Sequence, residues 1–428
     1  MNAGLAAAKR FPGLAVSTRP VYAVRGVRHQ RFLATGTGIK KSIFPDVQVN
    51  TIRPGVDFEL SSKEVIPKEY VQIKYSTMGD KKNPAIFICP SMSNSVHVTD
   101  DLDENGVLHH GWWRKVVGHG PSYGIDLDKF YVICGAPMGS PFGSTSPLTK
   151  STNEMHEPLR SMFPEITPRD QAFHQKLLLD TLGIDKVFAI VGGSMGGMQV
   201  LQFAVNFPEV YERFFVVAST AQTSPATVAL RSVQRAAVRM DPDFMHGYYD
   251  TNPTKGMGIA RMFGTICYRS PVEFDERFKW DAIKDDEGNP TFEVETYLEH
   301  QATKFTTQTN YDANCYMLLS QSMDLMNIAQ GFSSYDNAAS RIKASSHGCL
   351  LSYSTDRLTP AKDLERLGKS LGNQGVSVYC ETLESKFGHD AFLIQNEAHH
   401  LNVRLKPFLE DPHPVHAVSR LVKDLHGH

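Results

Sequence analysis

The residues best placed to do chemistry lie in the segment Gly192-Gly193-Ser194-Met195-Gly196. The apolar run Val187–Val191 precedes this segment, and residues 197–205 behind it have the pattern of a helix. A serine between glycines on a sharp strand-to-helix turn is the nucleophile-elbow pattern, because only small residues let the turn pass its neighbours. The pattern also occurs by chance in glycine-rich turns that do no chemistry. With a strand before it and a helix after it, we predict that Ser194 is a nucleophile.

A serine hydroxyl is a poor nucleophile at neutral pH and needs a base that is itself oriented by a carboxylate. With an elbow of this kind, the three residues follow one another along the chain in the order Ser, Asp or Glu, His. Asp356 follows the apolar run 349–353, and His389 follows the run 376–380. The chain has 17 histidines, so chain order and loop placement, not residue type, favour His389. We therefore predict His389 as the base and Asp356 as the residue that orients it.

An acyl intermediate on this serine also needs two backbone N–H groups that stabilise its oxyanion. One is expected from Met195, the residue directly after the nucleophile. The other is expected from the loop Ser91–Ser95, which follows the early apolar run 85–89. Both donors would then lie beside the hydroxyl of Ser194, at the carboxyl ends of the strands.

These groups must be positioned by strands that alternate with helices. The predicted strands are residues 70–77, 85–89, 130–134, 187–191, 214–219, 349–353 and 376–380. The run 70–77 alternates in polarity like an exposed or edge strand, whereas the later runs are apolar enough to be buried on both faces. A helix is predicted to begin at Pro168. The alternation predicts an α/β protein with a mostly parallel, doubly wound sheet.

One long stretch interrupts this alternation. Residues from Thr220 to about Ser340 have helical patterns and contain no clear buried parallel strand. Because the stretch lies between two predicted sheet strands, we expect a helical lid at about residues 222–340. The lid would be inserted into a single catalytic domain spanning residues 46–428.

The composition of the 428 residues excludes several classes of function. With 41% hydrophobic residues, 21% charged residues and a net charge of −2, nothing indicates a nucleic-acid partner. No apolar run approaches the about 18 residues that a membrane span requires. The six cysteines are scattered and form no C-x-x-C pair, which indicates reduced thiols and neither a disulfide framework nor a zinc site. We expect no bound metal and no resident cofactor.

The N-terminal segment differs from the rest of the chain. Residues 1–45 contain no Asp or Glu but eight Lys or Arg residues. An Arg-rich, acid-poor segment is typical of a mitochondrial transit peptide, although a disordered basic tail has the same composition. The sequence thus predicts a mitochondrial matrix protein with a transit peptide at residues 1–45. The position after Arg31, near Phe32-Leu33, is a candidate processing site, and the sequence leaves the exact site open.

Several ordered stretches make the sequence recognisable. They are Gly111-Trp112-Trp113, Gly143-Ser144-Thr145, Phe163-Pro164, residues 166–170, residues 193–199, residues 311–316 and residues 388–392. On these stretches, from about residue 70 to residue 409, the chain resembles the homoserine O-acetyltransferase family of α/β-hydrolase-fold acyltransferases. The family includes mitochondrial serine O-acetyltransferases of fungi.

The resemblance implies an activity and a set of substrates. It implies ping-pong transfer of an acetyl group from the co-substrate acetyl-CoA to the side-chain hydroxyl of L-serine or L-homoserine. The acetyl group would pass through an acyl-enzyme at Ser194. Such a reaction belongs to cysteine or methionine biosynthesis, and the partners would be these two substrates and a second copy of the chain in a homodimer.

The resemblance also implies roles for further residues. It suggests the N–H of Met92 as the second oxyanion donor. Arg261 and Tyr268 match the family residues that hold the carboxylate of the acceptor, and Asp390 matches the residue that takes its ammonium group. This agrees with elementary chemistry, because an amino acid needs both a cation and an anion in its pocket.

Two loops depart from the family pattern and leave the substrate open. Asn94-Ser95 stands where many members carry a Gly and an Asp, and Gly139-Ser140-Pro141-Phe142 replaces the common Gly-Gly-Cys-Tyr. Serine, homoserine or another hydroxyl is therefore expected as the acceptor, with an acetyl or a succinyl donor. Alternative functions are O-acetylation of a secondary metabolite, ester hydrolysis on the same fold, or binding without catalysis.

Overall fold

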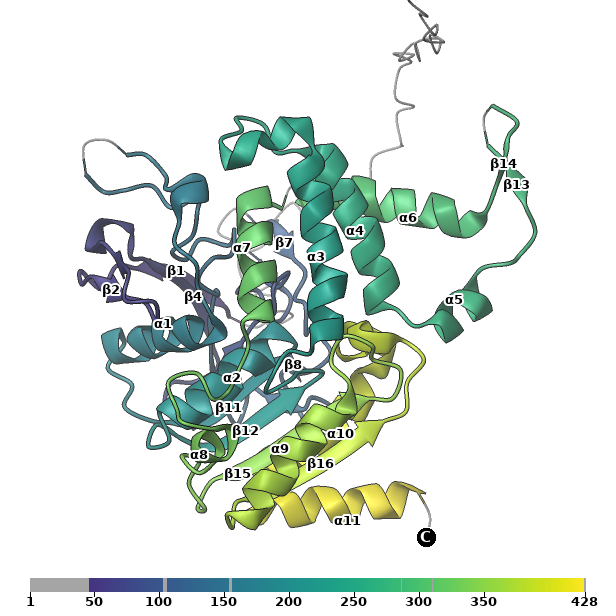
Figure 1. Ribbon diagram of the computed structural model, residues 1–428. Helices are drawn as coiled ribbons and strands as arrows, with labels where there is room; N and C mark the ends of the chain where they lie inside the picture. Colours follow the sequence, from purple (N-terminus) through teal and green to yellow (C-terminus); the bar gives the residue numbers. More distant parts are fainter. Residues whose placement is uncertain (1–45, 103–105, 154–155, 286, 310, 427–428) are drawn as a thin grey trace, which may run out of the picture.

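The computed structural model describes residues 46–102, 106–153, 156–285, 287–309 and 311–426, so the predicted leader lies outside the described residues. An eight-stranded sheet forms the centre of the molecule (Figure 1). Its strands, in spatial order, are β1 (Gln48–Ile52), β4 (Ile73–Met78), β10 (Tyr131–Gly135), β5 (Ala85–Cys89), β11 (Val187–Gly193), β12 (Tyr211–Val217), β15 (His347–Tyr353) and β16 (Ser377–Leu383). No helix of the described residues is long and apolar enough to cross a bilayer.

The strands from β10 to β16 pair in parallel, whereas β4 pairs antiparallel with both β10 and β1. The predicted mostly parallel sheet is therefore confirmed. The position of β4 in the sheet differs from the prediction. Strand β4 is not at the edge of the sheet, because β1, which the apolar runs did not reveal, pairs along its outer side. The mixed burial of β4 explains why its sequence alternates like that of an edge strand.

Helices cover both faces of the sheet. Helices α1 (Pro168–Thr181), α2 (Met195–Asn206) and α9 (Ala361–Asn373) pack against one face. Helices α10 (Ala398–Glu410) and α11 (Pro414–His426) pack against the other, together with Trp113. Helix α1 begins at Pro168, as predicted, because Thr167 and Asp170 form a reciprocal capping box. Both layers bury apolar side chains, which fixes the strand ends that carry the site.

The chain between β12 and β15 forms a mostly helical insertion, residues 218–346. Its elements are α3 (Pro225–Met240), α4 (Thr254–Tyr268), α5 (Pro271–Arg277), β13 (Ile283–Lys284), β14 (Pro290–Thr291), α6 (Glu293–Thr303), a π-helix (Lys304–Thr309), α7 (Ala313–Asp324) and α8 (Tyr335–Ala339). A 3₁₀ segment (Pro242–Gly247) joins α3 to α4. Helices α3, α4 and α7 stand together over the sheet, whereas α5, α6 and the β13–β14 hairpin extend to one side (Figure 1). The small antiparallel hairpin has no counterpart in the predicted all-helical stretch.

Short elements complete the fold. The two-residue strands are β2 (Phe58–Glu59), β3 (Val65–Ile66), β6 (Asp101–Leu102), β7 (Leu108–His109), β8 (Val117–Gly118) and β9 (Ile125–Asp126), and the remaining 3₁₀ segments are Lys68–Tyr70, Arg160–Met162, Gly388–Leu393 and Gln395–Glu397.

All six cysteines are free thiols, five of them buried and Cys380 exposed. The described residues contain no cluster of three or more His, Cys, Asp or Glu side chains suited to a metal ion.

Candidate active site

Ser194 lies between the end of β11 and the first turn of α2, in a conformation that few residues adopt. Its backbone has φ 54° and ψ −124°, and its N–H donates to the carbonyl of Val217 on the neighbouring strand at 3.0 Å. A Cβ atom on Gly196 would lie 2.0 Å from the carbonyl oxygen of Cys89, and one on Gly192 would lie 2.5 Å from the backbone of Gly196. The glycines therefore permit the close packing that holds the strained serine in place.

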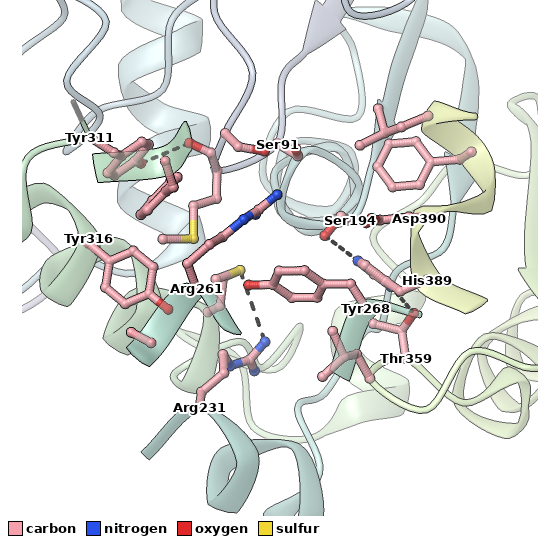
Figure 2. Close-up of a pocket in the computed structure, with 18 of the residues that line it drawn as sticks. Ser91, Ser194, Arg231, Arg261, Tyr268, Tyr311, Tyr316, Thr359, His389 and Asp390 are labelled. Carbon is pink, nitrogen blue, oxygen red and sulfur yellow. Dashed lines mark hydrogen bonds between the residues drawn. The ribbon is translucent and has the colours of Figure 1, made fainter. Parts of the chain in front are cut away.

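Ser194, His389 and Asp356 come together although they lie far apart in the sequence. His389 Nε2 is 2.8 Å from the hydroxyl oxygen of Ser194, and His389 Nδ1 is 2.7 Å from a carboxylate oxygen of Asp356. Asp356 follows β15, and His389 lies in the 3₁₀ turn Gly388–Leu393 behind β16. The loops that follow adjacent parallel strands thus bring Asp356 and His389 together, and Figure 2 shows the hydrogen bond between His389 and Ser194.

The carboxylate of Asp356 is buried but fully hydrogen-bonded. One oxygen accepts from the backbone N–H groups of Leu358 at 2.8 Å and Thr359 at 3.0 Å. The other accepts from the Thr359 hydroxyl at 2.6 Å and from His389. Burial alone would raise the pKa of Asp356, but the charge of His389 and these hydrogen bonds outweigh it and hold the pKa below its ordinary value. The group is therefore held as an anion beside the imidazole.

The imidazole of His389 has the opposite shift. Burial lowers its pKa, but the adjacent Asp356 carboxylate, through its charge and its hydrogen bond, raises the pKa above the ordinary 6.5. We predict that activity falls as pH decreases through this raised pKa, because protonated His389 cannot accept the proton of Ser194. The acid limb of kcat/KM for the acyl donor, measured from about pH 5 to 8, should have its midpoint above the ordinary histidine value. A flat profile across this range would contradict the role of His389 as base.

Two backbone N–H groups near Ser194 are free to serve as oxyanion donors. Among the described residues, no hydrogen bond uses the N–H of Met195, at the start of α2, or that of Met92. Met92 belongs to a turn in which the Asn94 N–H donates to the Ser91 carbonyl at 3.2 Å. The hydroxyl of Tyr311, which lies just before α7, donates to the Met92 carbonyl at 2.9 Å and so fixes this turn from the insertion (Figure 2).

A cavity of about 960 Å³, including its open mouth, contains Ser194 and His389. Met92 and the three residues expected to bind the acceptor, Arg261, Tyr268 and Asp390, also line this cavity. Arg261 and Tyr268 come from α4 in the insertion, and Asp390 follows His389 directly. The cavity is thus lined by every residue selected from the sequence except Asp356, which lies behind His389, and Met195, whose side chain is buried and whose N–H is the group of interest.

The guanidinium group of Arg261 is available for a ligand. Among the described residues it forms no ion pair, and its Nε is buried without a hydrogen-bond partner. Its one cation–π contact with the described residues is with Phe305, whose ring centroid lies 5.3 Å away. Asp390, in contrast, already has a partner. Its carboxylate lies 3.2 Å from the Nε of Arg269, which also contacts Glu273 at 2.8 Å. An ammonium group at Asp390 would therefore share this carboxylate with Arg269.

Four further residues of the site carried no separate signal in the sequence: Thr359, Tyr311, Arg231 and Arg269. Thr359 bonds to the orienting carboxylate, Tyr311 holds the turn of Met92, and Arg231 of α3 lines the cavity. Thr359 lies three residues after Asp356, which is the spacing at which a side-chain hydroxyl can bond back to an aspartate. The other three lie in the insertion, where only the tertiary structure shows which helix faces the cavity.

The sheet order, the elbow and the Ser–His–Asp arrangement together define a protein of the α/β-hydrolase fold. The family model described as alpha/beta hydrolase fold matches residues 107–393. The homoserine O-acetyltransferase of Deferribacter desulfuricans is 34% identical over 349 residues, which cover 79% of this chain and 89% of the relative. The chain therefore belongs to the homoserine O-acetyltransferase family, a family of acyltransferases.

Two further comparisons show the range of proteins that this chain is similar to. The serine O-succinyltransferase of Litchfieldella anticariensis is 36% identical over 338 residues, covering 76% of this chain and 90% of the relative. The crystal structure of esterase E22 is 24% identical, with a TM-score of 0.74 over 86% of this chain and all of that one (100%). The likeness to the esterase concerns the fold alone, which does not decide between transfer and hydrolysis.

Proposed function

We propose that the protein transfers a short acyl group, acetyl or succinyl, from its CoA thioester to the side-chain hydroxyl of L-serine or L-homoserine. The observation that carries this proposal is the guanidinium group of Arg261, which forms no ion pair with the described residues and lies in the same cavity as Ser194 and His389. A cation beside the nucleophile is what an amino-acid acceptor needs and what a simple esterase does not. The product would serve cysteine or methionine biosynthesis.

The reaction has two halves that use the same residues. His389 takes the proton of Ser194, whose oxygen attacks the thioester carbonyl, and the N–H groups of Met195 and Met92 stabilise the oxyanion. The C–S bond breaks, CoA leaves with the proton from His389, and the acyl group stays on Ser194. His389 then takes the proton of the acceptor hydroxyl, which attacks the acyl-serine. The bond between the acyl carbon and the Ser194 oxygen breaks, His389 returns the proton to Ser194, and the O-acyl amino acid is released. No metal or resident cofactor takes part in this proposal.

Transfer must outcompete hydrolysis, since water is present at about 55 M. A well-aligned nucleophile reaches effective molarities on the order of 10⁵ M or more, so a bound acceptor can win. We propose that Arg261 and Tyr268 hold the acceptor's carboxylate, that Asp390 holds its ammonium group, and that the insertion acts as a lid that limits water. The direct test is release of free CoA from acetyl-CoA or succinyl-CoA in the presence of serine, homoserine or threonine. Release that is independent of every acceptor would favour the esterase alternative.

We predict that Arg261→Ala raises the KM of the acceptor and slows transfer, by about 10- to 100-fold in kcat/KM, because a charge-assisted contact to a carboxylate is lost. Formation of the acyl-enzyme, followed by mass spectrometry of the intact protein, should stay near normal. Lys255→Ala on the exposed side of the same helix is the matched control and should change neither step. If Arg261→Ala left transfer to serine and homoserine untouched, the carboxylate would bind elsewhere.

We also propose a homodimer that forms through the insertion. Large apolar side chains are exposed on this part of the chain, among them Trp280 at 87%, Met240 at 82% and Ile259 at 57%. Exposed apolar groups gathered on one part of a molecule commonly mark an interface. Sedimentation velocity at several concentrations should show a species of twice the chain mass, and a strictly monomeric protein would contradict this proposal.

We propose that the protein works in the mitochondrial matrix, on the basis of its acid-free, basic segment 1–45. We predict that residues 1–45 direct a fused fluorescent protein into mitochondria. The same segment with its arginines changed to glutamine should leave the reporter in the cytosol, because import signals of this kind depend on positive charge. A diffuse cytosolic signal from the unaltered segment would contradict the proposal.

A further inference from the structure

The charged side chains around the cavity include one buried cluster with excess positive charge. Arg231 of α3 lines the cavity and is 6% exposed. Its Nε lies 2.6 Å from one oxygen of Asp324, and Nη2 of Arg235 lies 2.6 Å from the other oxygen. One carboxylate therefore serves two guanidinium groups, so the cluster Arg231–Asp324–Arg235 keeps one net positive charge.

A zwitterionic acceptor does not remove this charge. In the proposed function, its carboxylate binds Arg261 and its ammonium group binds Asp390, so the acceptor adds one charge of each sign. Arg269, which contacts Asp390 in the free protein, retains Glu273 as a partner at 2.8 Å. After the acceptor has bound, the cluster of Arg231 still lacks a counter-charge among the described residues that line the cavity.

An uncompensated guanidinium in a buried site is costly, and an anionic group of a substrate is a common compensation. Burial lowers the pKa of Arg231 while Asp324 raises it, and an arginine side chain stays protonated in proteins. An acetyl group offers only a methyl group to this charge. A carboxylate would satisfy it by a charge-assisted hydrogen bond.

The position of Arg231 relative to the catalytic groups favours the acyl group as the source of that carboxylate. In Figure 2, Arg261 and Arg231 lie on opposite sides of the hydroxyl end of Tyr268. His389 and Ser194 lie toward the opposite end of this side chain. Arg231 lines the same cavity as Ser194 and His389. An acyl chain on Ser194 and the guanidinium group of Arg231 therefore face the same space.

We propose that the preferred acyl donor carries a terminal carboxylate, as succinyl-CoA does, and that Arg231 binds this carboxylate. The inference rests on the proposed acyl transfer and specifies its donor. In the first half-reaction, the Ser194 oxygen forms an ester bond to the thioester carbon of the donor, the C–S bond breaks, and CoA leaves as the thiol. The distal carboxylate takes no part in bond making and stays ionised. In the second half-reaction, the acceptor oxygen replaces Ser194 on the same carbon.

The first test uses the unaltered protein and three donors with one saturating acceptor, serine or homoserine. We expect kcat/KM for succinyl-CoA to exceed that for acetyl-CoA by at least about 10-fold, as expected for one charge-assisted contact. Butyryl-CoA has the same chain length as succinyl-CoA but no carboxylate, so it should also be at least about 10-fold slower. Equal rates with succinyl-CoA and butyryl-CoA, or a preference for acetyl-CoA, would overturn the proposal. No transfer with any donor would reject the proposed function itself.

The second test compares two substitutions at Arg231. Arg231→Met should lower kcat/KM for succinyl-CoA by about 30-fold or more while changing that for acetyl-CoA by less than about 3-fold, because Asp324 keeps Arg235 as its partner. Arg231→Lys keeps the charge and should retain most of the preference for succinyl-CoA. An equal loss with both donors would indicate a structural role. A raised KM for the acceptor, with succinyl-CoA or acetyl-CoA as donor, would mean that Arg231 belongs to the acceptor site. The proposal would be overturned by this result or by an equal loss with both donors.

Discussion

Ser194→Ala is expected to lower kcat for acyl transfer by at least about a thousandfold, because the covalent route through the acyl-enzyme is lost. The residual rate would come from the remaining binding groups and oxyanion donors. Intact-protein mass spectrometry should show no acyl adduct after mixing with the donor. The fold should be retained, since the hydroxyl of Ser194 forms a hydrogen bond only with His389 among the described residues.

The control for this prediction is Ser370→Ala on α9, which removes a serine hydroxyl that bonds to the exposed Asp336, away from the cavity. It should have the activity of the unaltered protein. An active Ser194→Ala protein that still forms an adduct would remove the elbow from the mechanism.

Asp356→Asn is expected to reduce kcat by about 10⁴-fold, because an amide favours the wrong tautomer of the imidazole and cannot stabilise the imidazolium. The substitution also removes the charge that raises the pKa of His389. The remaining activity should therefore show an acid limb at lower pH than that of the unaltered protein. Measuring kcat across the pH range tests both effects in one experiment.

Asp336→Asn, at an exposed position of α8, is the matched control and should leave activity and its pH profile unchanged. Near-normal activity of Asp356→Asn would mean that another carboxylate orients His389. The hydrogen bonds from Thr359 and Leu358 give a structural reason to expect otherwise, since they hold this carboxylate in one orientation.

The central fold could be predicted because its signals are local. Apolar runs marked six of the strands, and glycine at positions 192 and 196 indicated the sharp turn between β11 and α2, where larger side chains would collide with Cys89 and Gly196. Chain order then selected Asp356 and His389 from many carboxylates and histidines. These features depend on residue type and spacing, which a sequence contains directly.

The charge arrangement of the cavity could not be predicted in the same way. The resemblance suggested Arg261, Tyr268 and Asp390, and the structure places all three in the cavity with Ser194. The resemblance could not show that Arg269 contacts Asp390 or that Arg231 and Arg235 share Asp324, because these pairs join segments that lie far apart in the sequence. Which charges are paired and which stay free depends on how α3, α4 and α7 pack, and a periodic pattern does not specify this packing.

The hydrogen bond from Tyr311 to the carbonyl of Met92 joins residues 219 positions apart in the chain. The turn that carries one expected oxyanion donor is thus held by a side chain of the insertion and not by the sheet domain alone. An engineered chain without residues 218–346 would lose this support together with Arg261 and Tyr268 of the proposed acceptor site. Exchange of this segment between relatives would therefore alter the rate of acylation together with the choice of acceptor, so the two properties are not separable modules for protein engineering.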